Sequence, residues 1–284
     1  MNHLISITKS DGTTELFEEE KLVNSLRRSG ASPEVIDEII NEVEKEMWNG
    51  MKTEDIYHRA FGLLKHRSHS VAIKYSTRRA IFELGPDGFP FEKFVARIFN
   101  FWGYEAVTDQ TVGGACVEHE VDVVAWKDKE LAMVEAKFHN EFGLKSDLKV
   151  VLYVKARFDD VADNFYDYGG MKRKLTSRWL FTNTKFSDMA IKYGECKDIK
   201  LIGWNYPNSL SLHEIIDQNC LHPVTSIMSL SHQEKKDLIG RNALLCVDII
   251  KNPDILHEIG VKTDIVSKVI EEANMVCGGN SKIL

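Results

Sequence analysis

The chain has 284 residues, is 43% hydrophobic and carries a formal net charge of −7 at pH 7. This length and apolar content predict two or three globular domains, and the acidic balance argues against a protein that coats polyanions nonspecifically. The absence of a signal-peptide pattern and of a long apolar run predicts no membrane span. Five scattered cysteines without a CxxC pair disfavour both a zinc ribbon and a disulfide framework and favour a reducing cytoplasm.

Residues 1–84 predict a small α-rich domain that begins with a β-hairpin. The expected elements are strands 4–9 and 14–17 and helices 18–28, 33–49, 53–65 and 70–84. Gly12 supplies the positive φ that the hairpin turn requires. Ser32 is expected to cap the second helix, with Pro33 in its first turn, and Thr53 to cap the third.

Residues 7–12, 50–56 and 72–78 resemble an ATP-cone in order and spacing. This regulatory nucleotide-binding module stands at the front of many class I and III ribonucleotide reductases, although the present chain is too short to be such a reductase. The resemblance implies an ATP or dATP site lined by Lys9, Glu15, Lys21 and Thr53. By this resemblance the lysines would contact the phosphates of the nucleotide, and Glu15 and Thr53 would contact its sugar or base. Ser10 departs from the usual arginine of the KRDG turn, and the chain has no P-loop, so nucleotide hydrolysis is not expected here.

Two glycines and two prolines within residues 85–90 mark a domain boundary. Residues 91–208 then predict a mixed sheet with helices on both faces, because a hairpin is followed by alternating helices and strands. The expected elements are helices 91–102, 148–158 and 187–195, with Ser187 as a cap, and strands beginning at 106 and spanning 121–126, 131–138, 178–183 and 199–204. Residues 137–185 carry ten Lys/Arg against six Asp/Glu, a net of +4, which suits a phosphate backbone or simply a solvated surface of mixed charge.

Strands 121–126 and 131–138 carry the residues with the clearest chemistry. Because strand side chains alternate between faces, Glu135, Lys137 and His139 share one face. Pairing of the strands brings Asp122, Glu135 and Lys137 into one acidic pocket that suits a divalent cation between two carboxylates. Mg²⁺ prefers oxygen ligands and lowers the pKa of a bound water, as phosphodiester hydrolysis requires. A Glu-x-Lys triplet alone is common on solvated strands, but the preceding strand here also supplies an acid.

Residues 91–92, 119–122 and 135–139 resemble the PD-(D/E)xK nuclease superfamily, particularly Mrr-type and related restriction endonucleases. The resemblance implies Asp122 and Glu135 as metal ligands with the Ala136 carbonyl as a third, Lys137 as the catalytic lysine, and Glu92 as an extra acid from the first helix. Val121 stands where a proline often precedes the first acid. Glu92 can also be an ordinary first-turn glutamate favoured by the helix dipole. His139 can lie near the scissile phosphate or at an interface.

Residues 209–284 predict only helices, one of which starts with a capping box at Ser231. Residues 259–270 faintly resemble a helix-hairpin-helix, whose hairpin amides bind phosphates without reading bases. A bundle for packing or oligomerisation, and hence a homo-oligomer, is the expectation that we prefer.

These patterns predict an α+β and α/β multidomain protein: an ATP-cone at 1–84, a restriction-endonuclease-like mixed-sheet core at 91–208 and a helical domain at 209–284. The predicted function is a cytoplasmic Mg²⁺- or Mn²⁺-dependent endonuclease that hydrolyses DNA and is regulated by ATP or dATP. Two alternatives remain open: a non-catalytic, nucleotide-responsive DNA-binding regulator built on a retired nuclease fold, and an RNA-directed nuclease.

Overall fold

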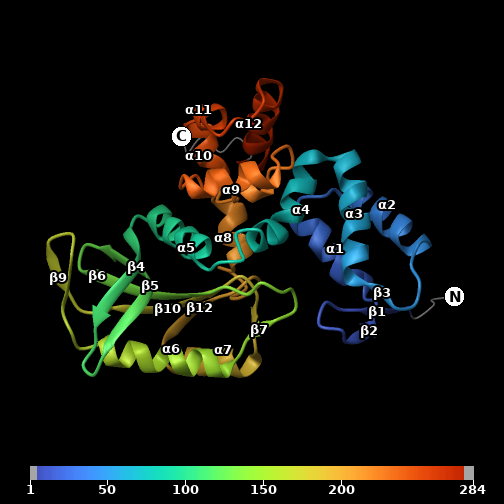
Figure 1. Ribbon diagram of the computed structural model, residues 1–284. Coiled ribbons are helices and arrows are strands. Elements are labelled where there is room, and N and C mark those ends of the chain that lie inside the picture. Colours follow the sequence, from blue (N-terminus) through green and yellow to red (C-terminus); the bar gives the residue numbers. More distant parts are fainter. Residues whose placement is uncertain (1–4, 278–284) are drawn as a thin grey trace. The chain divides into compact units, whose positions relative to one another are not determined.

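The computed structural model describes residues 5–277. Within this range the chain forms two compact units of mixed α/β structure, and each unit is assembled from separate stretches of sequence (Figure 1). Unit 1 consists of residues 5–80, 141–143 and 222–277, and unit 2 of residues 81–140 and 144–221. The predicted division into three consecutive domains stays a prediction.

The front of unit 1 contains a three-stranded sheet and four helices. Its elements are β1 (Ser6–Thr8), β2 (Thr14–Leu16), α1 (Glu19–Arg28), α2 (Pro33–Lys45), β3 (Met51–Lys52), α3 (Thr53–Arg67) and α4 (His69–Phe82). Strand β1 lies between β2, to which it is antiparallel, and β3, to which it is parallel. The predicted hairpin and four helices are confirmed. The sequence analysis missed β3, because a two-residue strand has no alternation to detect.

Local capping explains where two of these helices begin. Ser32 accepts a hydrogen bond from the Val35 amide and Pro33 opens α2, both as predicted. Helix α2 ends at Lys45 and not at residue 49, because the following residues turn back to bring Gly50, with a φ of 88°, to the carbonyl of Ser6. The predicted cap at Thr53 is wrong: Thr53 is the first residue of α3.

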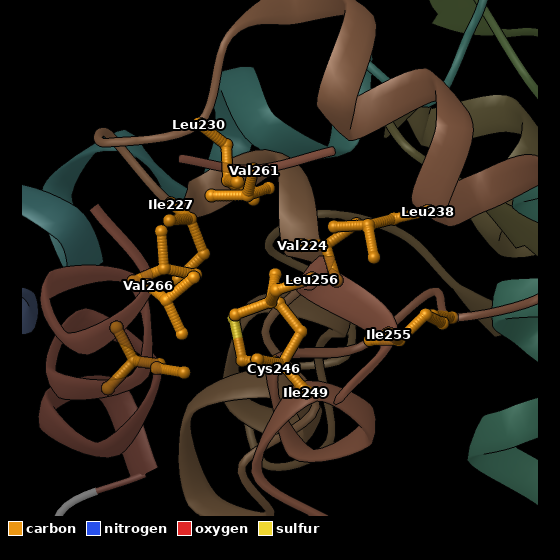
Figure 2. Close-up of a cluster of buried hydrophobic side chains, with 14 of the residues drawn as sticks. Val224, Ile227, Leu230, Leu238, Cys246, Ile249, Ile255, Leu256, Val261 and Val266 are labelled. Atoms are coloured by element: carbon orange, nitrogen blue, oxygen red, sulfur yellow. The ribbon is translucent and has the colours of Figure 1, made fainter. Parts of the chain in front are cut away.

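The back of unit 1 is helical, as predicted. Its elements are the 3₁₀ helix η1 (Val224–Ser226), α9 (His232–Gly240), α10 (Cys246–Lys251), α11 (Asp254–Glu258) and α12 (Thr263–Cys277). The capping box at Ser231 is present. Apolar side chains from these helices form one buried cluster, which includes Val224, Leu238 and Leu256 (Figure 2). Ile73 of α4 is buried in the same cluster, so the front and back of unit 1 share a core.

A buried carboxylate adds a polar joint to this shared core. Glu272 of α12 is 1% exposed and accepts hydrogen bonds from the amides of Met228 and Ser229, from the Ser229 hydroxyl and from His69 of α4. Burial alone would raise the pKa of Glu272, but the bonds from Ser229 and His69 outweigh it and lower the pKa below its ordinary value. Because these partners satisfy the charge, Glu272 can remain ionised in the core.

Unit 2 is built around a five-stranded sheet. Its main elements are α5 (Phe89–Phe101), β4 (Glu105–Gly113), β5 (Glu118–Lys127), β6 (Glu130–Lys137), α6 (Leu148–Val161), β10 (Ser177–Thr182), α7 (Asp188–Cys196), β12 (Ile199–Ile202) and α8 (Leu212–Gln218). The strand order is β12-β10-β6-β5-β4, in which β4, β5 and β6 are antiparallel neighbours and β6, β10 and β12 are parallel. Helix α5 covers one face and helices α6 and α7 the other (Figure 1). The predicted mixed sheet with helices on both faces is confirmed.

Smaller features of unit 2 differ from the prediction. Helix α5 starts at Phe89, inside the predicted linker, and β12 ends at Ile202 and not at residue 204. Four short strands were missed: β7 (Lys145–Ser146) pairs with β11 (Lys185–Phe186), and β8 (Tyr166–Tyr168) pairs with β9 (Met171–Arg173). Ser187 caps α7 as predicted. Every helix within residues 5–277 is too short or too polar to cross a membrane.

Candidate functional site

The candidate site lies where strands β5 and β6 separate. Their paired register ends with Val123 opposite Val134. Beyond this pair, the Ala136 amide donates a hydrogen bond of 2.6 Å to Asp122 Oδ2, so a side chain of β5 accepts the bond in place of its backbone. Asp122 and Glu135 therefore follow the last pair on facing strands. The structure brings these two predicted residues together at the middle of the sheet.

Lys137 lies two residues beyond Glu135 on the same strand and opposite Thr182 of β10. It is exposed, whereas Glu135 is only partly accessible. The ammonium of Lys137 opposes the rise in the pKa of both Asp122 and Glu135. The predicted arrangement of two carboxylates with one nearby ammonium is therefore present at this strand end.

Helix α6 contributes a second cation that the sequence analysis missed. Arg157 Nη1 donates to Glu135 Oε2 at 2.5 Å, and the two side chains are 14% and 18% exposed. The signal was available, because Arg157 interrupts an apolar stripe at helical spacing formed by Val154, Phe158 and Val161. An arginine on the buried face of a helix requires an acidic partner, so this pattern indicates a buried ion pair of Arg157.

Burial and mutual repulsion shift the acids of the site. Burial, followed by the charge of Asp122, raises the pKa of Glu135 to about 7, although Arg157 and Lys137 oppose the shift. Burial also raises the pKa of Asp122, against the hydrogen bond from Ala136 and the charge of Arg157. Two neighbouring carboxylates in a poorly solvated site resist being ionised together. A bound cation would relieve this repulsion.

Glu92, in the first turn of α5, belongs to the same electrostatic cluster. Its pKa is raised to about 7, first by burial and then by Asp122, Glu120 and Asp109. A helix N-terminus would by itself favour the carboxylate and lower this pKa. Burial and the nearby acids act in the opposite direction and place Glu92 in the same electrostatic environment as Asp122. The sequence analysis missed Asp109, which lies on β4 with a φ of 56°.

The donor atoms at this strand end suit a hard divalent cation, although they are few. Within residues 5–277, no three His, Cys, Asp or Glu side chains are grouped closely enough to hold a metal ion. The predicted ligands are the carboxylates of Asp122 and Glu135 and the carbonyl oxygen of Ala136. Mg²⁺ commonly uses one or two carboxylates and keeps several waters. These residues therefore fit Mg²⁺ or Mn²⁺ better than an ion that needs a full protein cage.

A buried polar network fixes the chain just after Lys137. The His139 amide donates to Asn183 Oδ1, and Asn183 Nδ2 donates to the His139 carbonyl, both at 2.8 Å. The His139 ring lies 3.0 Å from the Ser146 hydroxyl, which in turn lies 3.2 Å from the Thr182 hydroxyl. Burial and Lys137 lower the pKa of His139. The side chain of His139 therefore has a positioning role in this structure, next to the candidate lysine.

A second charged cluster, in the front of unit 1, contains three of the predicted nucleotide residues. Lys9 forms an ion pair with Glu15, and Lys21 Nζ lies 3.2 Å from Glu15 Oε1 and 3.0 Å from Glu18 Oε1. Thr53 directly follows Lys52, the residue opposite Thr8 in the β1–β3 register. The three strands thus place Lys9, Glu15 and Thr53 near the same end of a small sheet. Their contact with a nucleotide stays a prediction.

Comparison with known families supports part of this interpretation. Residues 5–82 match the model of the ATP cone domain, which confirms the resemblance of the front segment. Residues 222–277 match the model described as AF1548-like, C-terminal. A solved structure described as Can2 from Sulfobacillus thermosulfidooxidans in complex with cyclic tetra-adenylate covers 71% of this chain and 54% of its own. At 11% identity and a TM-score of 0.31, that similarity carries no argument.

Two relatives are closer. An Archaeoglobus fulgidus protein described as uncharacterized is 37% identical over 185 residues, which is 65% of this chain and all of the relative. The crystal structure of a protein of unknown function, AF1548, is 36% identical with a TM-score of 0.55, and the match covers 68% of this chain and all of that one. The chain therefore belongs to the AF1548-like family and carries an ATP cone domain at its front.

Proposed function

We propose that unit 2 is a metal-dependent nuclease that hydrolyses phosphodiester bonds in DNA, and that a nucleotide bound to the ATP-cone regulates it. The observation that supports this proposal best is the bond between the Ala136 amide and Asp122 at the separation of β5 and β6. It holds Asp122 against the strand that carries Glu135 and Lys137. Two acids that can hold a divalent cation, with a lysine beside them on adjoining strands, suit metal-assisted phosphodiester hydrolysis.

Each residue has a distinct part in the proposed reaction. Asp122 and Glu135, with the Ala136 carbonyl, would hold Mg²⁺ or Mn²⁺, which when bound supplies a Lewis acid and lowers the pKa of a coordinated water. Lys137 is exposed beside the acids and would orient the attacking water and oppose the phosphate charge. Glu92, with a pKa of about 7, is placed to accept or donate a proton near neutral pH.

Cleavage of supercoiled plasmid DNA in the presence of Mg²⁺ or Mn²⁺ tests the catalytic half of the proposal. We expect Lys137→Met and Asp122→Asn to abolish cleavage while the far-ultraviolet circular dichroism stays unchanged. Lys129→Met is a matched control, because Lys129 is an exposed lysine in the turn of the same hairpin. Cleavage that survives both site substitutions would rule out this site. A parallel assay on single-stranded RNA separates a DNA nuclease from an RNA-directed one.

One observation favours a second candidate, a nucleotide-responsive DNA-binding regulator without catalysis. The Arg157 guanidinium already neutralises Glu135, as it would in a retired site that no longer holds metal. Titration calorimetry with Mn²⁺ separates the two candidates. Heat of binding that disappears in Asp122→Asn supports the nuclease, whereas DNA binding without any metal binding supports the regulator.

The regulatory half of the proposal rests on the ATP cone domain and on its charged cluster. Two lysines flank Glu15 on this surface, and phosphate groups of ATP or dATP would give them stronger charge-assisted bonds than one carboxylate provides. Plasmid cleavage measured with and without each nucleotide tests this half independently. A rate that does not respond to either nucleotide would remove the regulation and leave the nuclease intact.

A further inference from the structure

A three-residue segment of the loop between β6 and β7 is part of unit 1. Residues 141–143 group with the ATP-cone, although the chain on both sides of them belongs to unit 2. The Ser10 hydroxyl donates a hydrogen bond of 2.8 Å to the Phe142 carbonyl. The guanidinium carbons of Arg78 and Arg79 lie 5.5 and 5.4 Å from the centre of the Phe142 ring, within the range of cation–π attraction.

Gly143 makes this close approach possible. It has a φ of +94°, and a Cβ atom at this position would lie 2.7 Å from Ser10 Oγ, closer than real Cβ contacts occur. Both the backbone conformation and the space therefore require glycine. Gly143 and the Phe142 carbonyl meet Ser10, and the Phe142 ring meets two arginines of the cone. Residues 141–143 therefore form a built contact with the cone.

The contact is made by the turn that also presents the proposed nucleotide ligand Lys9. The Lys9 amide donates to the Thr13 carbonyl, and the Gly12 amide to the Lys9 carbonyl, at 2.8 and 3.0 Å. The Asp11 carboxylate accepts from Thr13 within the same turn. A ligand that moves Lys9 therefore moves Ser10 with it. Ser10 stands where an ATP-cone usually has arginine, and in this protein it holds Phe142 instead.

Both ends of the same loop are fixed in unit 2. His139 is bonded to Asn183 and Ser146, and Ser146, Thr182 and Asn183 are fully buried. Only six residues separate His139 from Ser146, so the loop has little slack to absorb a displacement at Phe142. Lys137 lies two residues before His139. A pull on the loop therefore acts on the strand end that carries the proposed catalytic lysine.

We propose that residues 141–143 are a strap through which the nucleotide state of the ATP-cone controls the position of Lys137. This inference rests on the proposed function for its effect on catalysis, but not for the mechanical coupling itself. A nucleotide that binds better when the Lys9 turn adopts one of two positions shifts the strap toward that position. By linkage, metal or DNA bound near Lys137 changes nucleotide affinity by the same factor.

Hydrogen exchange of the full-length protein tests the coupling without any assay of catalysis. In the wild type, saturating ATP is expected to change the exchange rates of amides in residues 137–146 by about fivefold or more, the lower end of typical coupling. Phe142→Ala should remove this change while ATP affinity, measured by calorimetry, stays within about threefold of the wild type. Phe165→Ala is the matched control, because Phe165 also lies beside a cation, Lys174, and is more exposed than the half-buried Phe142.

Plasmid cleavage provides the second readout. Phe142→Ala and Gly143→Ala should keep basal cleavage and lose its response to nucleotide, whereas Phe165→Ala should keep both. An exchange response that persists in Phe142→Ala, or a wild type without any response of residues 137–146 to ATP, overturns the strap. A third result is that ATP changes hydrogen exchange in residues 137–146 as expected while neither the wild type nor any variant cleaves nucleic acid. That result would support the strap and contradict the proposed nuclease activity.

Discussion

Each of the two charged clusters contains a glutamate that pairs with a basic side chain, but one glutamate is near the surface and the other is largely buried. In the ATP-cone, Glu15 pairs with Lys9 and Lys21, and the bond from Lys9 lowers the pKa of Glu15. In unit 2, Glu135 pairs with Arg157, yet its pKa is raised to about 7. An ion pair therefore does not by itself decide whether a carboxylate is easy to ionise.

The strands on which the two glutamates lie explain the difference. Glu15 is on a three-residue edge strand with two ammonium groups beside it. Glu135 is on the central strand of five, under α6, and Asp122 adds a like charge beside it. In the first cluster the two lysines are exposed and can contact an anion, although Glu15 and Glu18 balance their charge. The second cluster has an excess of buried negative charge and suits a cation.

The largest effect is expected from Glu135→Gln. If Glu135 holds the metal, cleavage should fall by about 10²–10³, which corresponds to about 3–4 kcal/mol of transition-state stabilisation. Rates under metal saturation measure this directly. Glu130→Gln, at the start of the same strand, is the control and should change the rate by less than about twofold. Equal effects of the two substitutions would mean that the loss of any carboxylate from β6 slows cleavage, and that Glu135 has no specific role.

The same glutamate makes stability depend on pH. Its folded pKa of about 7 lies above its ordinary value of 4.5, so the folded protein holds an extra proton between these values and loses stability as pH rises through that window. The two pKa values differ by about 2.5 units, which corresponds to about 3 kcal/mol. Thermal unfolding of wild type and Glu135→Gln, compared from pH 4.5 to 7, should show a smaller loss in the variant, in which only Glu92 and Asp122 keep raised pKa values. No such loss is expected from Glu15, whose pKa is lowered.

Features of the two clusters that depend on residues close together in the sequence could be predicted from it. Alternation along strands 121–126 and 131–138 predicts Asp122, Glu135 and Lys137 on adjoining strands, because that inference needs only local periodicity and one hairpin. The order and spacing of the front segment predict the ATP-cone. These are properties of contiguous sequence, and the structure contains them.

Contacts between distant segments were not predictable in the same way. Arg157 reaches Glu135 from a helix 22 residues away, and Ser10 bonds the Phe142 carbonyl across 132 residues. Neither pair leaves a periodic signal in one sequence. The same applies to the grouping of the front and back of unit 1, which rests on Ile73 and Glu272 meeting side chains far along the chain. The predicted three-domain division followed the sequence order for this reason.

Removing Arg157 tests whether it occupies the place of a metal ion. In Arg157→Gln the Glu135 carboxylate loses its competing cation, so Mn²⁺ affinity is expected to rise by about tenfold, or about 1.4 kcal/mol. Calorimetric titration over a series of pH values measures it, because the loss of Arg157 also raises the pKa of Glu135 further. Lys155→Gln is the matched control on the same helix, because Lys155 pairs with Asp159. Unchanged or weaker Mn²⁺ binding in Arg157→Gln would mean that the arginine supports the site and does not compete for it.

The smallest effect is expected in the ATP-cone, where the charges are exposed. Lys21→Ala should weaken ATP binding by about threefold to fivefold, because an exposed charge contact contributes at most about 1 kcal/mol. Lys45→Ala is the matched control: Lys45 pairs with Glu42 on a helix of the same unit, away from the Lys9 turn in sequence, and its loss should leave ATP affinity within about twofold. Equal weakening by both substitutions would show that net charge, and not the cluster around Glu15, attracts the nucleotide. Lowering the salt concentration sharpens the distinction, because screening acts on long-range attraction more than on a direct contact.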